Sequence, residues 1–261
     1  MKLIQSKDHQ VLKRIKRLSG HRRTQDSNDL IIEGKKLLFE AIHAKIEIKV
    51  VCVEEGCEED WMRFSDILYV VPPNLFSKIS TLDSPSKVIG VGSIPSPKPL
   101  DELLHEVYTL VVLDRVQDPG NLGTLVRTSE AFIVDALICL KGSCSVMNPK
   151  VLRAAAGSAF RIPIYETIDE KAIFEKLKSN GFTCFAMGKS GLPIQNVVFP
   201  KKTAFFFGTE GEGLSETCLS LCQNTLTISM KASVESLNVA TSVAITLHER
   251  SRREDWLLLS P

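Results

Sequence analysis

Short apolar runs alternate with amphipathic stretches along almost the whole chain. In the first hundred residues these runs predict strands at 30–32, 46–53, 67–71 and 88–94. The segments between them show helical spacing over 34–44 and again from Pro72 to about Ile79, where two prolines can begin a helix. Small strands and helices in alternation predict a compact α/β module.

The same alternation continues in the second part of the chain. Strands are predicted at 108–113, 136–140, 162–165, 182–187, 203–207 and 226–230. Helical patterns lie between them, for example near 170–179. A last helix carries an apolar face made of Leu237, Ala240, Ala244 and Leu247 and ends in the cations Arg250, Arg252 and Arg253, which suit a helix C-terminus. Buried strands alternating with helices predict a mostly parallel sheet covered on both faces.

Between the two parts, residues 95–99 read Pro-Ser-Pro-Lys-Pro. Three prolines in five positions cannot continue a helix or a central strand, and they favour a stiff, extended spacer. We therefore predict one domain over 1–94, a linker over 95–104 and a second domain over 105–261.

Composition narrows the class of protein further. The chain has 261 residues, 44% hydrophobic and 24% charged, with a net charge of +1, so any nucleic-acid contact must rest on local patches. No apolar run approaches the ~20 residues of a membrane helix, and the first eight residues hold no signal core, so we expect a cytoplasmic protein. The seven cysteines are scattered, and Cys218 and Cys222 have no second ligand pair nearby, so we expect reduced thiols and no metal.

Two segments concentrate positive charge. Residues 1–23 carry eight Lys or Arg against one acid, and their apolar residues fall at helical spacing, which predicts a basic amphipathic helix. Residues 141–161 contain no acid, and Asn148-Pro149 predicts a helix start. Such cations are either a solvated helix face or contacts to RNA phosphates. The candidate RNA-binding residues are Lys13, Arg14, Arg17, Lys150 and Arg153.

The candidate chemistry lies at strand ends. The strand at 203–207 runs into Gly208-Thr209-Glu210-Gly211-Glu212-Gly213, and ligands of α/β sheets bind at such ends. This loop is neither the dinucleotide fingerprint nor a phosphate loop, and its two carboxylates suit a cationic ligand better than a phosphate. Polar residues follow other predicted strands as well. Taken singly they are ordinary caps or surface groups, but together they predict one site: Asn121, Arg127, Glu210, Ser236 and Asn238.

Three segments of the chain form a set of sequence motifs. The first is Val112-Leu113-Asp114-Arg115-Val116-Gln117-Asp118-Pro119-Gly120-Asn121-Leu122-Gly123 through Arg127-Thr128, the second is Phe207 to Leu214, and the third is Ile228-Ser229-Met230 with Val234 to Ala240. Together they resemble the motifs of a known family, the SpoU/TrmH family of RNA ribose 2′-O-methyltransferases. Asn148-Pro149-Lys150 and Phe160 to Pro163 match recurring family segments. The resemblance covers about residues 108 to 253, and the first hundred residues look like the family's ribosomal-protein-like substrate-binding module.

The resemblance implies S-adenosylmethionine as methyl donor, a trefoil knot in the C-terminal domain and a homodimer with the active site at the subunit interface. It implies that the backbones of Gly208, Ile228 and Leu237 hold the cofactor, with Thr209, Gly213 and Met230 beside them. The five polar residues at the strand ends align with catalytic and substrate positions. The implied substrate is RNA, with large-subunit rRNA favoured over tRNA.

Three positions depart from the family pattern: Thr209 stands for a usual Asn, Ser229 for a usual Pro and Ala232 for a usual Gly. We expect the last two to loosen or re-angle the cofactor loop. Two alternatives stay open. One is an RNA-binding or ribosome-assembly protein without catalysis on the same fold, and the other is a nucleotide-binding α/β enzyme.

Overall fold

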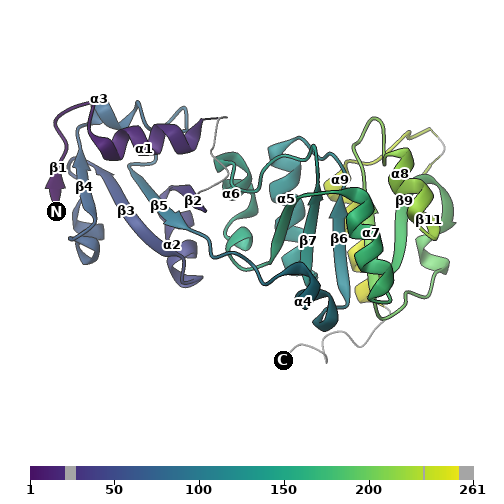
Figure 1. The fold of residues 1–261 in the computed structure, drawn as a ribbon. Coiled ribbons are helices and arrows are strands. Elements are labelled where there is room, and N and C mark those ends of the chain that lie inside the picture. Colours follow the sequence, from purple (N-terminus) through teal and green to yellow (C-terminus); the bar gives the residue numbers. More distant parts are fainter. Residues whose placement is uncertain (21–27, 232, 253–261) are drawn as a thin grey trace. The chain divides into compact units, whose positions relative to one another are not determined.

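A computed structural model describes residues 1–20, 28–231 and 233–252. The chain forms two compact units (Figure 1). The first contains Met1–Ser96 and Met147–Phe160, and the second contains Pro97–Val146 and the chain from Arg161 onward. This division differs from the expected domain boundaries because 147–160 belong to the first unit. The predicted linker 95–104 is also not extended throughout, because the helix Leu100–Glu106 begins inside it.

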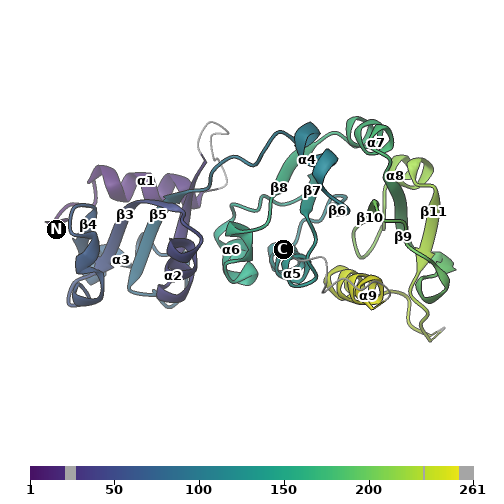
Figure 2. The ribbon, with the colours of Figure 1, turned by 90° about the horizontal axis from the view of Figure 1, so that it is seen from below.

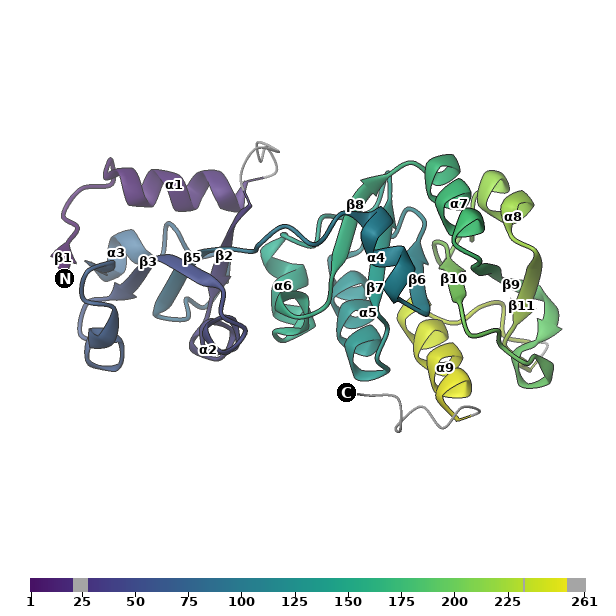
Figure 3. The same cartoon turned by 60° about the horizontal axis from the view of Figure 1, so that its bottom comes forward.

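The first unit is built on a five-stranded mixed sheet in the order β1-β4-β3-β5-β2, with β5 antiparallel to both of its neighbours. Its elements are β1 (Lys2–Leu3), α1 (Gln10–Ser19), β2 (Asp29–Glu33), α2 (Lys35–His43), β3 (Glu47–Glu54), η1 (Glu59–Phe64), β4 (Leu68–Val71), α3 (Pro73–Phe76), β5 (Val88–Ser93), α6 (Pro149–Ala155) and η2 (Ser158–Phe160). Figure 3 shows α1 and α2 on opposite faces of this sheet. The predicted strands and the α/β module are thereby confirmed.

The basic helix predicted near the N-terminus is α1. Its buried residues Val11, Leu12, Ile15 and Leu18 enter the core of the first unit, as their spacing predicts. Next to this apolar face, Arg14 pairs with Asp29 of β2, which also pairs with Lys49 at 2.9 Å. Burial acts to raise the pKa of Asp29, but the hydrogen bonds from the two cations outweigh it and leave that pKa below its usual value. Arg22 and Arg23 lie outside the described residues.

The second unit is built on a six-stranded sheet in the order β11-β9-β10-β6-β7-β8, and every pairing in it is parallel. Its elements are α4 (Leu100–Glu106), β6 (Thr109–Leu113), α5 (Pro119–Ala131), β7 (Ala136–Leu140), β8 (Ile164–Ile168), α7 (Glu170–Ser179), β9 (Thr183–Pro193), η3 (Ile194–Asn196), β10 (Thr203–Phe207), α8 (Glu216–Leu221), β11 (Asn224–Thr227) and α9 (Val239–Ser251). Figure 2 shows α5 and α9 together on one face and α7 with α8 on the other. The predicted parallel sheet with helices on both faces is confirmed.

The sheet's centre is apolar on both sides, because β6 and β10 are buried at every position. On the α7 face, Phe206 stacks on Phe174 with ring centroids 4.5 Å apart. In the described part of the chain no helix is both long and apolar enough to cross a membrane.

The last helix differs from its prediction. Leu237 precedes α9 and Ala244 is only partly buried, while Val239 and Val243 complete the buried face. Arg250 is not a solvated end cation: it is 1% exposed and donates to the backbone oxygens of Pro200 and Lys201, at 3.4 and 3.0 Å. These carbonyls lie some fifty residues earlier in the chain, so no local pattern indicated them. Arg253 lies outside the described residues.

Candidate functional site

A cavity of about 670 Å³ lies in the second unit, beside the second half of β9 and at the ends of β10 and β11. Its wall is formed by 187–190 in β9, by 207–214 at the end of β10 and in the loop after it, by Leu219 of α8, and by parts of 225–242 from β11 to the first turn of α9. All six predicted cofactor residues line it: Gly208, Thr209, Gly213, Ile228, Met230 and Leu237. The parallel strands therefore bring two distant sequence motifs to one cavity, as the strand-end rule anticipates.

The loop after β10 folds back on itself. The Thr209 N–H donates to Gly213 O at 3.1 Å and the Gly213 N–H donates to Thr209 O at 2.9 Å. This fold brings the backbone of Gly213 and Leu214 against Gly208, where a Cβ would lie only 2.1 Å from the Gly213 carbonyl. Gly208 is therefore required for space, since any side chain would force the loop away from the strand end.

At the tip of this loop, Glu210 joins the first turn of α5 to the start of α9. The Asn121 side-chain amide donates to Glu210 Oε1 at 2.9 Å, and the Asn238 amide donates both to the same carboxylate oxygen and to Asn121 Oδ1, the latter at 2.9 Å. Asn238 also begins α9, because its Oδ1 accepts from the Ala240 N–H. Three of the five predicted catalytic residues thus form one hydrogen-bonded group, which we call the Asn–Glu–Asn network.

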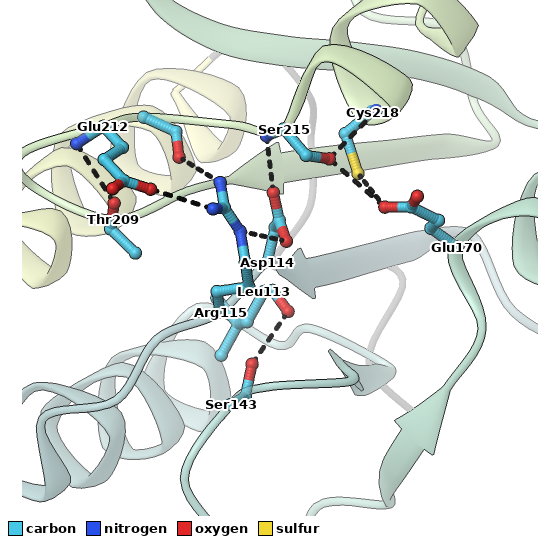
Figure 4. Close-up of polar contacts among 10 residues, drawn as sticks. Leu113, Asp114, Arg115, Ser143, Glu170, Thr209, Glu212, Ser215 and Cys218 are labelled. Atoms are coloured by element: carbon cyan, nitrogen blue, oxygen red, sulfur yellow. Dashed lines mark hydrogen bonds and ion pairs between the residues drawn. The ribbon is translucent and has the colours of Figure 1, made fainter.

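At the base of the same loop lies a charged cluster (Figure 4). Asp114 is buried and accepts from the Ser215 N–H at 2.7 Å and from Arg115 Nε at 3.1 Å. The hydrogen bond with Asp114 raises the pKa of Arg115. Next to it, Glu170 accepts from Ser215 Oγ at 3.2 Å and lies 3.8 Å from Cys218 Sγ, whose pKa burial raises to about 12. The polar side chains of this cluster are thus hydrogen-bonded to one another or to the backbone of the same loop.

The segment after β11 closes the cavity from the other side. Ser236 is exposed and lines the cavity with Leu237. Ser229 Oγ accepts from Gln195 Nε2 of η3 at 2.9 Å, so the residue that stands for the family's proline has a hydrogen-bond partner of its own. Ala232 lies outside the described residues.

Arg127 is placed differently from the other four catalytic candidates. It is exposed on α5, six residues or about 9 Å of helix beyond Asn121, and it does not line the cavity. Its side chain forms no hydrogen bond or ion pair with the residues that the structure describes.

The five predicted RNA-binding residues all belong to the first unit. Arg17 and Lys150 are exposed, and Lys13 pairs with Asp8 at 3.1 Å. The pairing of Arg14 with Asp29 is described above. Arg153 donates to Thr81 Oγ1 at 2.8 Å. Two of the five are therefore engaged in contacts that also hold the first unit together.

Sequence reasoning missed one wall of the cavity, residues 187–190. The predicted strand ended at Met187, whereas β9 continues to Pro193 and passes its backbone along the cavity. Gly188 directly follows that predicted strand and could have indicated this wall, because a glycine at a strand end allows close approach of a ligand or of another backbone, as at Gly208. Lys189 is the one cation among the described residues that line the cavity.

A family model described as the SpoU rRNA Methylase family matches residues 108–248, which is more than half of the chain. The chain belongs to the SpoU rRNA methylase family. A second model, the MRM3-like substrate binding domain, matches residues 9–90. The resemblance seen in the three motifs is thus confirmed, and so is the expected enzyme class, an RNA methyltransferase.

Individual relatives of this SpoU methylase extend over nearly its full length. The 23S rRNA (guanosine(2553)-2′-O)-methyltransferase RlmP of Bacillus subtilis is 29% identical over 250 residues, which are 95% of this chain and 98% of that protein. Crystal structures of an rRNA methyltransferase from Sinorhizobium meliloti, with and without AdoMet, align with a TM-score of 0.83 at 24% and 25% identity, covering 99% of both chains. The expected fold class is confirmed, together with the knotted C-terminal region that this methyltransferase fold carries.

Proposed function

We propose that this SpoU methylase transfers the methyl group of S-adenosylmethionine to a ribose 2′-hydroxyl of RNA, with large-subunit rRNA as its substrate. The observation that carries the proposal is the cavity, which gathers all six cofactor residues expected from the motifs and borders the Asn–Glu–Asn network. The relative RlmP, whose name gives a 2′-O-methyltransferase of 23S rRNA, supports the choice of reaction and of RNA.

The residues of the cavity fit this cofactor. Its volume of about 670 Å³ lies within the ~300–1,000 Å³ of small-molecule sites. Apolar groups such as Ile228 and Leu237 line it, and the carboxylate of Glu210 suits a positively charged ligand, whereas that of Glu212 is paired with Arg115. When bound, S-adenosylmethionine supplies a methyl group already activated by its sulfonium.

The protein's own part is then to place the ribose and to stabilise charge. The nucleophilic hydroxyl, the methyl carbon and the sulfur must lie in line, which is a matter of positioning. We assign this to Ser236 and to the Asn–Glu–Asn network, because the network fixes the loop tip that borders the cavity. A developing alkoxide also needs a positive partner.

Arg127 is the candidate for that partner. Arginine carries a fixed positive charge and a planar fork of donors, so we assign Arg127 to bind the 3′-side phosphate and the alkoxide rather than to act as the base. Because Arg127 does not line its own cavity, we infer a homodimer in which Arg127 of one protomer completes the site of the other. An Arg127→Lys variant with normal turnover at every pH would overturn the phosphate role, because Lys cannot form the planar fork.

The first unit is proposed to hold the RNA. The family model for a substrate-binding domain covers 9–90, and the exposed cations Lys13, Arg17 and Lys150 lie in this unit. Clustered cations gain affinity for RNA by counterion release. Since rRNA is also the substrate named for the relative RlmP, the cytoplasm is the proposed location.

The test is transfer of labelled methyl from S-adenosylmethionine to unmodified total RNA, separated by size. The expected result is label in large rRNA that survives alkali as a dinucleotide, because a 2′-O-methyl group blocks cleavage. Label in tRNA alone would keep the chemistry and replace the substrate. No label, with S-adenosylhomocysteine still raising the melting temperature by mass action, would favour the non-catalytic RNA-binding protein.

A further inference from the structure

Arg115 follows β6, but its side chain reaches the loop after β10 (Figure 4). Its Nη1 donates to Glu212 Oε2 at 2.9 Å and its Nη2 to Gly213 O at 3.4 Å. The Arg115 backbone has a φ of 58°, which is uncommon for a residue with a side chain. Gly142 leaves room beside it, because a Cβ there would come within 3.2 Å of Arg115 Cγ.

The charges explain why this side chain stays in place. Asp114 is 2% exposed, whereas the side chain of Arg115 is 33% exposed and that of Glu212 is 78% exposed. A buried carboxylate that lost its cation would be strongly destabilised, so Asp114 holds the guanidinium over itself. From this fixed position Arg115 reaches outward to Glu212 and Gly213. The exposed Glu212 pair alone would contribute little.

Two contacts therefore join the chain after β6 to the loop after β10. Asn121, in the first turn of α5, holds the tip of that loop through Glu210, and Arg115 holds its base through Glu212 and Gly213. Glu212 and Gly213 line the cavity, but Arg115 does not. Without Arg115, the segment 212–215 would keep the hydrogen bond from the Ser215 N–H to Asp114, but the Gly213 carbonyl would lose its hydrogen bond from the guanidinium.

We propose that Arg115 is a positioning residue that holds the loop after β10 in the shape that binds the cofactor. This role rests on the proposed function, since S-adenosylmethionine is the ligand in question. Arg115 acts through Glu212, Gly213 and Asp114 and touches neither the cofactor nor the reacting atoms. Its loss should therefore raise the KM for S-adenosylmethionine more than it lowers kcat at saturation.

The test compares Arg115→Met and Arg115→Lys with Lys176→Met as a matched control. Lys176 forms an ion pair with Asp101 of α4, its side chain is 37% exposed, and neither residue lines the cavity. Calorimetry is expected to show that Arg115→Met weakens S-adenosylhomocysteine binding about tenfold, as loss of one charge-assisted hydrogen bond would. Arg115→Lys keeps the positive charge but not the planar fork of donors, so it should weaken S-adenosylhomocysteine binding by a smaller factor. Lys176→Met should bind as the wild type does.

Hydrogen exchange in the cofactor-free protein provides a second readout. Amides of 212–215 should exchange faster in Arg115→Met, while those of the sheet keep their rates. Adding Glu212→Gln should weaken binding no further, because Glu212 acts through Arg115. If both Arg115 variants keep wild-type affinity and loop exchange, the proposal is overturned. If the wild type binds no S-adenosylhomocysteine, the proposed function fails, and the exchange rates still decide whether Arg115 orders the loop.

Discussion

Replacing Gly208 by alanine tests whether the cavity needs the close backbone packing seen in the loop after β10. The added methyl would lie 2.1 Å from the Gly213 carbonyl carbon and oxygen and 2.3 Å from Leu214 N. Ordinary contact between such atoms begins near ~3.5 Å, so the two backbone segments must separate by roughly 1 Å or more. Because both line the cavity, the whole wall moves with them.

The expected size of the effect follows from that displacement. A shift of about 1 Å in a positioned site can cost on the order of 10²-fold, so S-adenosylhomocysteine should bind Gly208→Ala about ten- to a hundredfold more weakly. Overpacking of this kind costs roughly 1–3 kcal/mol, which lowers the melting temperature by about 2–12 °C in a protein of this size. The core of β10 is untouched, so the chain should still fold.

Gly211→Ala is the matched control in the same loop. A Cβ at Gly211 meets no atom within 4 Å, and its backbone does not lie in the left-handed region that disfavours alanine. Calorimetric titration of both variants and the wild type decides the matter. Unchanged affinity in Gly208→Ala, or an equal loss in both variants, would refute the packing argument.

Three further predictions concern the dimer, the first unit and the cofactor loop. Arg127→Ala and Asn238→Ala should each be inactive, but purified mixed dimers should regain about half of the wild-type rate, since one of two symmetric sites is then intact; no recovery would place Arg127 in its own chain's site. Asp29→Asn should lower the free energy of unfolding at pH 7. Because the pKa of Asp29 is lowered in the folded state, its ionised carboxylate stabilises the fold above its pKa in the unfolded chain, about 4, and this stabilisation is lost as the pH falls below its pKa in the folded protein. The difference in stability between variant and wild type, which we call the gap, should therefore close at low pH. Denaturant unfolding at pH 7 and pH 3 measures this gap, and an equal gap at both would count against it. Gln195→Leu should weaken S-adenosylhomocysteine binding about threefold, as loss of one neutral hydrogen bond would; the same loss in a Ser229→Ala background would show that their hydrogen bond is not the cause.

Much of the fold could be predicted because its signals are local. The helix expected near 170–179 is α7, and the helix start expected at Asn148 is confirmed, since Asn148 Oδ1 accepts from the Lys150 N–H at 2.9 Å. Short buried runs bounded by turn residues identified the strands for the same reason. The helix α4 was missed because three nearby prolines outweighed the apolar spacing of the residues that follow them.

The site was predictable only in part. Motif spacing and strand ends indicated which residues face the cavity, but the hydrogen bonds within the Asn–Glu–Asn network join residues 28, 89 and 117 positions apart. The contact of Arg115 with Glu212 spans 97 positions. Such pairings depend on the order of the strands in the sheet, and a single sequence does not reveal that order.

The assignment of 147–160 to the first unit determines how the protein can be divided. A fragment that ends at Ser96 lacks α6, and with it the hydrogen bond from Arg153 to Thr81, whose side chain and N–H both donate to the buried Glu33. A fragment that begins at Pro97 carries α6 without the strand β2 beside which it lies. The proline-rich segment is therefore a poor place to cut. Isolated halves should be aggregation-prone, and binding of RNA or cofactor is best measured on the whole chain.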